Sequence, residues 1–420
     1  MRISLPPDVA TLGTYVPRLL ALMGENLWAK RWRDLGRDFE RSPMLARIGA
    51  DYHWLELLLH DQAATIATRG RLEPPLIVED FAVLHFVSIT MEVHTRLTPR
   101  GQKALQGRLR SALSSETGFA ALYLEMDIAR RLFDAGFDVE FPDLEGTARY
   151  DLHFSNARVS GEVECKSLSA DAGRKIHRKD FYRLLEPLEK YLLRRAETGA
   201  REVLLVTLRD RLPSAMAHQK KLREAIRHFA TDSVDSSAEG EFFCLKREAF
   251  TPAFEAARAV DQHTFYKACV TVYGENIHVA GPMPDAGRCL VVMRSKMEDD
   301  TSKPWLEAME KAVTQFSGSR PAFIAMQFND MATDELMRSH FRRRAVILTN
   351  AVCRRPEAAH VTAIFICPYR GLIEDEHGVV APAFGLFNTE GAFGVDPADY
   401  AAFYGTMSDD EFARRIGARP

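Results

Sequence analysis

GEVECKS, residues 161–167, alternates charged side chains with small apolar ones. Glu162, Glu164 and Lys166 occupy every second position, and a valine and a cysteine lie between them. In an extended strand, successive side chains point to opposite faces. The pattern therefore predicts a β-strand that carries two carboxylates and one ammonium group on the same face.

A further acid lies on the strand expected before this one. Asp151 precedes Glu164 by thirteen residues, at the start of a predicted strand over 149–154. If the two strands form a hairpin, both carboxylates come near one end of the sheet, where they repel unless a cation lies between them. Mg²⁺ binds through one or two carboxylates and leaves positions for water and a substrate phosphate. Lys166 can position or activate such a water and offset charge that develops on a phosphate.

Glu125 is the third candidate acid. It lies in a predicted helix over 118–135, on the side of the apolar stripe, about 40° from the stripe centre at roughly 100° per residue. A carboxylate in that position needs a partner or a metal ion. A metal ligand, a buried salt bridge and a rim position all remain open for Glu125.

The order of these residues resembles the core of the PD-(D/E)XK nuclease superfamily, which includes restriction-endonuclease-like enzymes and archaeal Holliday-junction resolvases. The resemblance covers roughly 116–230 and rests on the helix glutamate and on GFDVEF (136–141), ARYDLHF (148–154) and GEVECKS. It implies a mixed sheet flanked by helices and Mg²⁺-dependent phosphodiester hydrolysis, with Mn²⁺ as a substitute. The implied catalytic residues are Asp151, Glu164 and Lys166, and the implied metal ligands are Asp151, Glu164 and Glu125.

Two other acids compete for these roles. Pro142-Asp143 spells the motif literally, but it lies in PDLEG, which has the composition of a loop. Asp151 is therefore the preferred ligand. Glu162 shares the strand face with Glu164, and we interpret it as an outer charge of the sheet; a supporting acid or a ligand is the alternative.

A basic stretch follows the motif. Arg174, Lys175, Arg178 and Lys179 crowd the predicted start of a helix, where positive charge opposes the helix dipole. Amide ends and cations together attract phosphate, which predicts a nucleic-acid contact here. A solvated basic loop paired with Asp171 and Asp180 explains the same residues.

The whole chain is predicted to be α/β (α+β overall), in three parts. These are a helical N-terminal domain (1–115), a restriction-endonuclease-like mixed-sheet core (116–235) and a C-terminal α/β domain (242–420), with strands that include 202–208 in the core and 265–273 and 322–328 beyond it. The run 289–328 resembles the strand–helix–strand order of the core, so the last part is either a degenerate repeat or a generic α/β domain. Glu374 and His377 form a weaker metal-ligand pair in a charged loop, and Ser408–Glu411 opens a last helix.

Composition limits the function classes. Net charge is −3 over 420 residues, so any nucleic-acid surface must be local. The six cysteines lack zinc or disulfide spacing, and no signal peptide or membrane span is evident, which favours the cytoplasm. The acids and Lys166 favour a metal-dependent nuclease, and the resemblance implies DNA rather than RNA as substrate and a role in genome maintenance or defence against foreign DNA. A non-catalytic nucleic-acid-binding or scaffolding protein is the alternative, and a homodimer or partner proteins bound through the terminal domains are expected.

Overall fold

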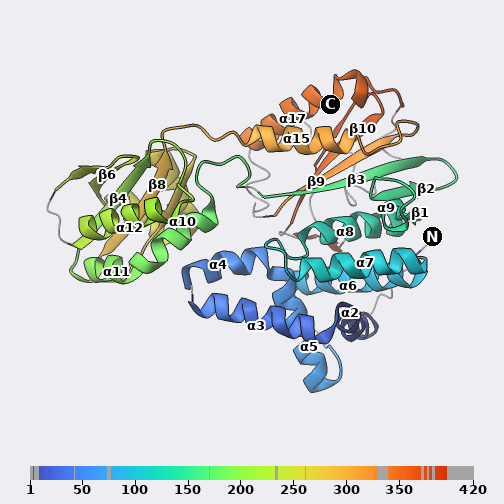
Figure 1. Cartoon of the computed structure of the whole chain (residues 1–420), viewed down its shortest axis with the longest axis horizontal. Coiled ribbons are helices and arrows are strands. Elements are labelled where there is room, and N and C mark those ends of the chain that lie inside the picture. Colours follow the sequence, from blue (N-terminus) through green and yellow to red (C-terminus); the bar gives the residue numbers. More distant parts are fainter. Residues whose placement is uncertain are drawn as a thin grey trace. The chain divides into compact units, whose positions relative to one another are not determined.

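The structure is a computed structural model. It describes residues 3, 9–41, 43–72, 77–169, 171–231, 235–260, 262–329, 339–369, 373–375, 378–380 and 384–394. The chain divides into two compact units, each described separately below (Figure 1). The first comprises Met1–Gly36, Gly49–Ala170 and Ser302–Pro420, and the second Arg37–Ile48 and Asp171–Thr301.

The first third of the chain is helical, as predicted. The helices are α1 (Val9–Gly13), α2 (Tyr15–Met23), α3 (Glu25–Arg41), α4 (Pro43–Tyr52), α5 (Trp54–Arg69), α6 (Val78–Arg96), α7 (Pro99–Ala112) and α8 (Ala120–Asp134). However, residues 1–115 are not a domain of their own. Val16, Leu55 and Val83 belong to the same buried cluster as the strand residues Phe323 and Phe365, because the apolar stripes of these helices pack towards the sheet.

A six-stranded mixed sheet forms the centre of the first unit. Its order is β1 (Asp138–Glu140), β2 (Leu152–Ser155), β3 (Ser160–Leu168), β9 (Ala322–Phe328), β10 (Val361–Pro368) and β13 (Phe384–Phe387). The pairs β3–β9 and β9–β10 are parallel and the others antiparallel. The predicted hairpin is confirmed, since Leu152 pairs with Val163 and Ser155 with Ser160. Together these features establish a mixed α/β fold.

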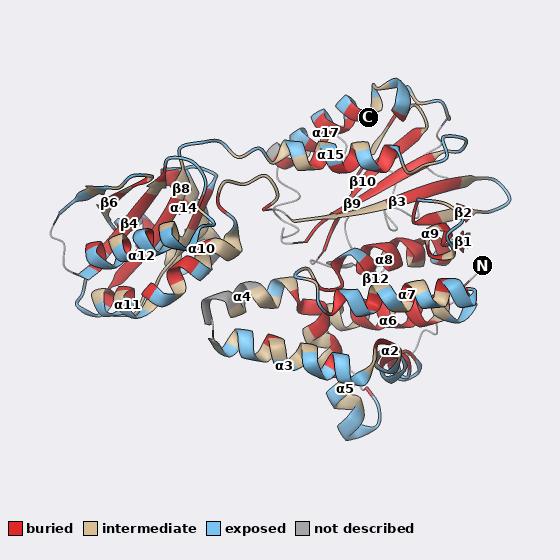
Figure 2. Cartoon of the chain, viewed as in Figure 1, coloured by how far each residue is buried: buried red, intermediate tan, exposed pale blue. Residues whose placement is uncertain are grey.

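Helices cover both faces of this sheet. α15 (Ser302–Val313) and α17 (Ser339–Cys353) lie on one side, and α8, α7 and α6 on the other (Figure 1). Figure 2 shows β9 and β10 coloured as buried along their length, as expected for strands covered on two faces. The GEVECKS strand, β3, is therefore an inner strand of the sheet, between β2 and β9.

The predicted domain boundaries at 235 and 242 are wrong, because the strand beside β3 is β9. The strand predicted to complete the core, β4 (Arg201–Leu208), belongs instead to a second sheet in the second unit. The run 289–328 is not a repeat within one sheet, because its first strand, β8 (Arg288–Ser295), joins β4 and its last strand joins β3. β4 and β9 are both short apolar runs, so their composition does not reveal which of them pairs with β3.

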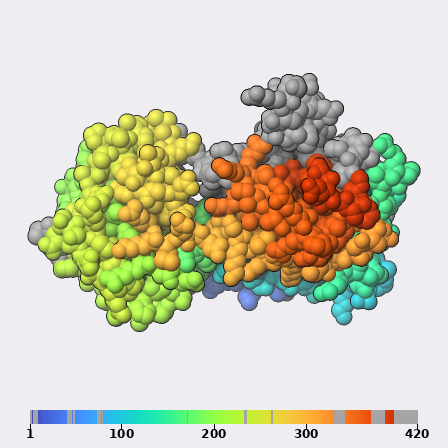
Figure 3. Space-filling view, turned by 90° about the horizontal axis from the view of Figure 1, so that it is seen from above, coloured from blue at the N-terminus to red at the C-terminus, as the bar shows by residue number. Residues whose placement is uncertain are grey.

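The second unit is a three-layer sandwich around a five-stranded sheet. The strand order is β5 (Ser237–Glu239), β6 (Phe243–Ala249), β4, β8 and β7 (Ile277–Ala280). One face is covered by α10 (Arg178–Leu185), η1 (Glu186–Leu188), α11 (Glu189–Glu197) and α12 (Met216–Thr231). The other is covered by α13 (Pro252–Val260) and α14 (Gln262–Tyr273). Figure 3 shows green and yellow residues from both halves of this unit sharing one surface.

Two local predictions in this unit have opposite outcomes. The bend expected at Pro187 is confirmed, because the 3₁₀ turn η1 separates α10 from α11. The strand predicted over 265–273 is wrong, because this stretch is helix α14. Its buried residues Phe265, Cys269 and Tyr273 recur every four positions, which is helical spacing despite the β-branched and aromatic composition.

The remaining described elements are short. They are α9 (Pro142–Glu145), η2 (Pro356–Ala358), β11 (Ile373–Asp375) and β12 (Gly378–Val380). Glu374 lies in β11, whereas His377 and the predicted last helix at Ser408–Glu411 lie outside the described residues. No helix in the described ranges is long and apolar enough to cross a bilayer.

Gly161 tests the register of β3 against its neighbours. A β-carbon there would lie 2.6 Å from Phe154 Cζ and 2.9 Å from Phe323 Cε2. We therefore expect Gly161→Ala to lower the free energy of unfolding by about 1–3 kcal/mol, because two buried rings must move. All four tryptophans (28, 32, 54 and 305) lie in the first unit, so urea unfolding followed by tryptophan fluorescence reports on it.

Gly107→Ala is the matched control for this substitution. Gly107 lies in α7, and apart from the adjacent backbone of this helix no described atom lies within 4 Å of the position that a β-carbon would take there. Alanine at this helical position is therefore expected to stabilise the unit by up to about 1 kcal/mol. Equal effects of the two substitutions would contradict the packing of Gly161 between Phe154 and Phe323.

His278 is expected to make the second unit sensitive to acid. Burial lowers the pKa of His278 to about 3, against the opposing effect of its hydrogen bond to the Ile176 carbonyl at 2.9 Å. The unfolded chain protonates this histidine below about pH 6.5, whereas the folded one does not, so stability is complete above pH 6.5 and is lost as pH falls towards 3. Between pH 7 and 4.5 we expect a loss of roughly 2–3 kcal/mol.

Urea unfolding at both pH values, followed by far-UV circular dichroism, measures this loss. The relevant transition is the one without a change in tryptophan fluorescence, because the second unit has no tryptophan. In His278→Gln the titrating ring is removed, and the difference between the two pH values is expected to shrink. An unchanged difference in this variant would contradict the assignment to His278.

Candidate functional site

The charged face of β3 carries the first two site residues. Glu164 is 2% exposed, and its Oε1 lies 2.5 Å from Lys166 Nζ. Lys166 Nζ also donates to Gln315 Oε1 at 2.6 Å, and Gln315 Nε2 donates to the Arg149 carbonyl at 3.0 Å. The ammonium group is therefore held between a carboxylate of its own strand and an amide that follows α15. Gln315 was not predicted, because it is 149 residues from Lys166 in sequence.

Asp151 reaches the same strand across the hairpin. It is 8% exposed, and its Oδ2 accepts a hydrogen bond of 2.7 Å from the Cys165 amide. Its own amide donates to the Val163 carbonyl at 3.1 Å, which continues the β2–β3 pairing by one residue. Asp151 is thus fixed to the backbone on both sides of Glu164. The structure brings together the aspartate, glutamate and lysine that the sequence pattern singled out.

Glu125 lies in α8 and is 9% exposed. Its Oε2 is 2.8 Å from Arg108 Nη1, so the buried salt bridge that the sequence left open is present. Arg108, in α7, also binds Asp143 through its other terminal nitrogen. Asp143 was predicted to lie in a loop, but it lies in the short helix α9. Arg108 thus connects Asp143 to Glu125, a contact that no local sequence pattern predicts.

Burial is the largest cause that raises the pKa values of the three acids. Burial raises the pKa of Glu125 to about 8, with the Asp151 carboxylate as the next cause and Arg108 opposing. Burial, followed by Asp151, raises the pKa of Glu164 to about 7, against the effect of Lys166. The pKa of Asp151 is raised by burial and lowered by the Cys165 amide. The three carboxyl groups therefore share one electrostatic environment.

The net charge of this cluster suits a divalent cation. The four acids Glu125, Asp143, Asp151 and Glu164 are accompanied by two cations, Arg108 and Lys166. Full ionisation would leave two negative charges, which either two protons or one divalent ion would neutralise.

The donor atoms of this cluster also suit Mg²⁺. Glu164 Oε2 is buried and has no hydrogen-bond donor. Within the described part of the chain no group of three or more His, Cys, Asp or Glu side chains forms a ready metal cage. Mg²⁺ needs only one or two carboxylates, because water and substrate phosphate supply its other ligands. Asp151 and Glu164 fit that requirement, with Glu125 held by Arg108 beside them.

Glu162 is not the outer charge that was expected. It is 0% exposed, and its carboxylate accepts from the Ser317 amide at 2.9 Å and the Ser317 hydroxyl at 2.5 Å. Arg320 Nη1 lies 3.5 Å away. The reason is that this face of β3 is covered by the turn after α15, which no pattern in the strand reveals. Glu162 therefore anchors that turn through its contacts with Ser317 and Arg320.

The four predicted nucleic-acid contacts lie in the second unit, whereas the acids and Lys166 lie in the first. Arg174 Nε is 3.9 Å from Asp171 Oδ1, and Lys175 Nζ is 3.5 Å from Asp210 Oδ1. Buried Asp171 also accepts from the amide of Arg178, the first residue of α10, and so offsets the positive charge at that helix start. The pairing with Asp171 agrees with the loop alternative, although Asp180 pairs with His177 and Arg183 instead. Lys179 follows Arg178 in the first turn of α10.

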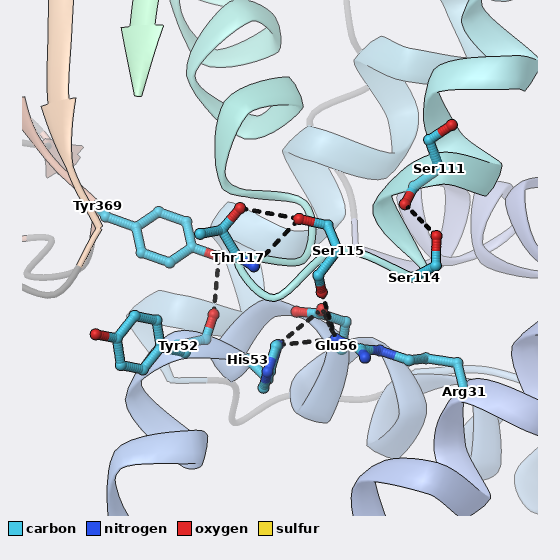
Figure 4. Close-up of polar contacts among 9 residues, drawn as sticks. All are labelled: Arg31, Tyr52, His53, Glu56, Ser111, Ser114, Ser115, Thr117 and Tyr369. Carbon is cyan, nitrogen blue, oxygen red and sulfur yellow. Dashed lines mark hydrogen bonds and ion pairs between the residues drawn. The ribbon is translucent and has the colours of Figure 1, made fainter. Parts of the chain in front are cut away.

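A separate buried carboxylate braces the N-terminal helices. Glu56, in α5, is 0% exposed and accepts from Arg31 Nη2 at 3.3 Å, with His53 Nδ1 at 3.1 Å (Figure 4). Arg31 Nη2 also donates to the Ser115 carbonyl at 3.4 Å, in the loop that precedes α8. The Tyr369 hydroxyl, at the end of β10, donates to the Tyr52 carbonyl at 3.4 Å in the same view.

The sequence signal for this cluster was a glutamate directly after Trp54 and Leu55 of an apolar stripe. Gly118 (φ +55°) passes so close that a β-carbon there would overlap Glu56 Oε1. Because its contacts join α5 to α3 and to the loop before α8, we interpret the cluster as a structural brace.

Comparisons with known proteins add nothing to this geometry: no family model, no curated protein and no solved structure matches the chain.

Proposed function

We propose that the protein is a metal-dependent nuclease that hydrolyses phosphodiester bonds, with DNA as its substrate. The observation that carries the proposal is the buried Asp151–Glu164 pair beside Lys166, in which Glu164 Oε2 has no donor. Burial and the neighbouring Asp151 raise the pKa of Glu164, so two ionised carboxylates are unfavourable here, and a bound divalent cation would offset that cost.

The order of elements supports this proposal. If residues 171–301 are regarded as an insertion, the first unit reads α8, β1, β2, β3, α15, β9, with β9 parallel to β3. That is the order of helix, three strands, helix and strand that the PD-(D/E)XK resemblance implies. Glu125 lies on the first helix, Asp151 at the second strand, and Glu164 and Lys166 on the third. The inserted unit also explains why the predicted core continued into the wrong strand.

Each residue has a defined role in this proposal. Asp151 and Glu164 would hold Mg²⁺. Glu125 would be an auxiliary ligand, and Arg108 neutralises its charge when no metal ion is bound. Bound Mg²⁺ would polarise the scissile phosphate and lower the pKa of a coordinated water. Lys166 donates hydrogen bonds to the phosphate and stabilises negative charge developing on it. Gln315 and Glu164 hold the ammonium in place, so little reorganisation is needed when substrate arrives.

The proposal is tested with purified full-length protein. Plasmid, linear duplex DNA, single-stranded DNA and RNA are each incubated with Mg²⁺, Mn²⁺ or EDTA. We expect cleavage of DNA with either metal and none with EDTA. Cleavage that persists in EDTA would rule out the metal-dependent mechanism.

The alternative is a non-catalytic nucleic-acid-binding or scaffolding protein. It is favoured by one observation, namely that Arg108 and Lys166 already occupy carboxylate oxygens of Glu125 and Glu164. Calorimetric titration with Mn²⁺ distinguishes the two. If Mn²⁺ does not bind and no substrate is cut, the scaffold function replaces the nuclease.

A further inference from the structure

The second unit has strongly unequal charge along its chain. Residues 174–231 contain fifteen Lys and Arg and seven Asp and Glu, whereas residues 232–301 contain seven Lys and Arg and twelve Asp and Glu. The net charge of the whole chain, −3, does not reveal this asymmetry. The fold converts part of it into an asymmetry between surfaces, because the helices of the two segments cover opposite faces of one sheet.

Buried side chains show which helices cover which face. α10, α11 and α12 pack on Leu204, Val206 and Val291, whereas α13 and α14 pack on Val203, Leu205 and Val292. These strand residues alternate, so the two sets of helices lie on opposite faces. The first set, here called the basic layer, carries ten Lys and Arg: 178, 179, 183, 190, 194, 195, 220, 221, 223 and 227. The second set carries only Arg258 and Lys267.

Several cations of the basic layer project into solvent. Lys190 and Arg194 are exposed on α11, and Lys220 and Arg227 on α12. Lys190 Nζ and Arg227 Cζ lie 5.0 and 5.8 Å from the ring centroid of half-buried Tyr191, which joins the two helices. Lys190, Arg194 and Arg227 have no carboxylate partner among the described residues. Like charges gathered on neighbouring helices repel one another, and a polyanion removes that repulsion.

We propose that the basic layer is a docking surface for the phosphate backbone of nucleic acid. The inference rests on the proposed nuclease function for its choice of polyanion, and it extends beyond the four cations near the start of α10 to α11 and α12. Arginine predominates among the cations, and its guanidinium binds phosphate through two parallel hydrogen bonds. Such a surface holds nucleic acid without reading bases, so binding is expected to be strong at low salt and independent of sequence.

The test compares two double charge reversals in the full-length chain that also carries Lys166→Ala. Fluorescence anisotropy with a labelled DNA duplex in EDTA measures binding alone, without cleavage. Lys190→Glu/Arg194→Glu, in the basic layer, is expected to weaken binding at least 10-fold at 100 mM salt. It should also lower the slope of log K against log [salt] by about 2, since each phosphate contact contributes about 0.9.

Arg258→Glu/Lys267→Glu is the matched control on the opposite layer and is expected to change DNA affinity less than 2-fold. Equal losses in the two variants, or unchanged affinity and slope in the basic-layer variant, would overturn the docking surface. A loss of binding to a polyglutamate probe without a loss of DNA binding would also overturn it, in favour of an acidic protein partner. These outcomes are separate from the proposed function, because plasmid cleavage is measured with Lys166 intact. If the same reversal in that chain leaves both cleavage and DNA binding unchanged, the proposed nuclease site stands and only this surface is overturned.

Discussion

Lys166→Ala is expected to reduce the rate of metal-dependent DNA cleavage by at least about 100-fold, which is the usual loss when one preorganised charge or donor is removed from an active site. Lys166 is the only cation hydrogen-bonded to Glu164 among the described residues, and Gln315 holds it in position. In the proposed mechanism, removal of the ammonium group takes away a hydrogen-bond donor from negative charge that develops on the phosphate. Initial rates of plasmid nicking at saturating Mg²⁺ measure the loss.

Asp151→Asn tests the metal half of the same site. It retains an oxygen that can accept from the Cys165 amide, but it removes the negative charge. We expect a similar loss of cleavage together with weaker Mn²⁺ binding, whereas Lys166→Ala should leave Mn²⁺ binding intact. Lys303→Ala is the control, because Lys303 is exposed on α15 and pairs only loosely with Glu307, at 3.9 Å. Wild-type cleavage in either site variant would exclude this site.

Glu56→Ala is expected to lower the free energy of unfolding of the first unit by about 3–5 kcal/mol, the range for a buried ion pair that loses one partner. The substitution leaves the guanidinium of Arg31 without its carboxylate in a site where its Nε is already buried and without a partner. It also opens a cavity beneath Gly118, which has no side chain to fill the space. Urea unfolding followed by tryptophan fluorescence reports the change, because Trp54 precedes Glu56 by two residues.

Asp61→Ala, on the exposed side of the same helix, is the control and should change stability by less than about 0.5 kcal/mol. A double-mutant cycle with Arg31→Ala isolates the pair, and the double variant should lose less than the sum of the single losses. Additive losses would show that the Arg31–Glu56 contact contributes nothing and that the cost of Glu56→Ala is only the cavity.

Much of the candidate site follows from local patterns. The alternation in GEVECKS predicted a strand with Glu164 and Lys166 on one face, and the structure contains it as β3. The turn at Ser155 placed Asp151 opposite the same strand, as its hydrogen bond to Cys165 shows. Glu125 was placed on the buried side of a helix from the spacing of apolar residues alone. These features depend on side-chain patterns that repeat every two or 3.6 residues, and such a pattern can be recognised within a short stretch of sequence.

The partners of those residues were decided only by the tertiary structure. Three contacts join residues that are distant in sequence. Arg108 and Glu125 are 17 positions apart, Gln315 and Lys166 are 149 apart, and Ser317 and Glu162 are 155 apart. The same holds for the sheet order, because β4 and β9 are both buried apolar strands and only packing selects β9 as the neighbour of β3. The distribution of charge is a third case, since the helices of the two segments of residues 171–301 cover opposite faces of one sheet, which sequence order does not reveal. A period in the sequence specifies which face a side chain takes, but the group that meets it there depends on how distant segments close around one core.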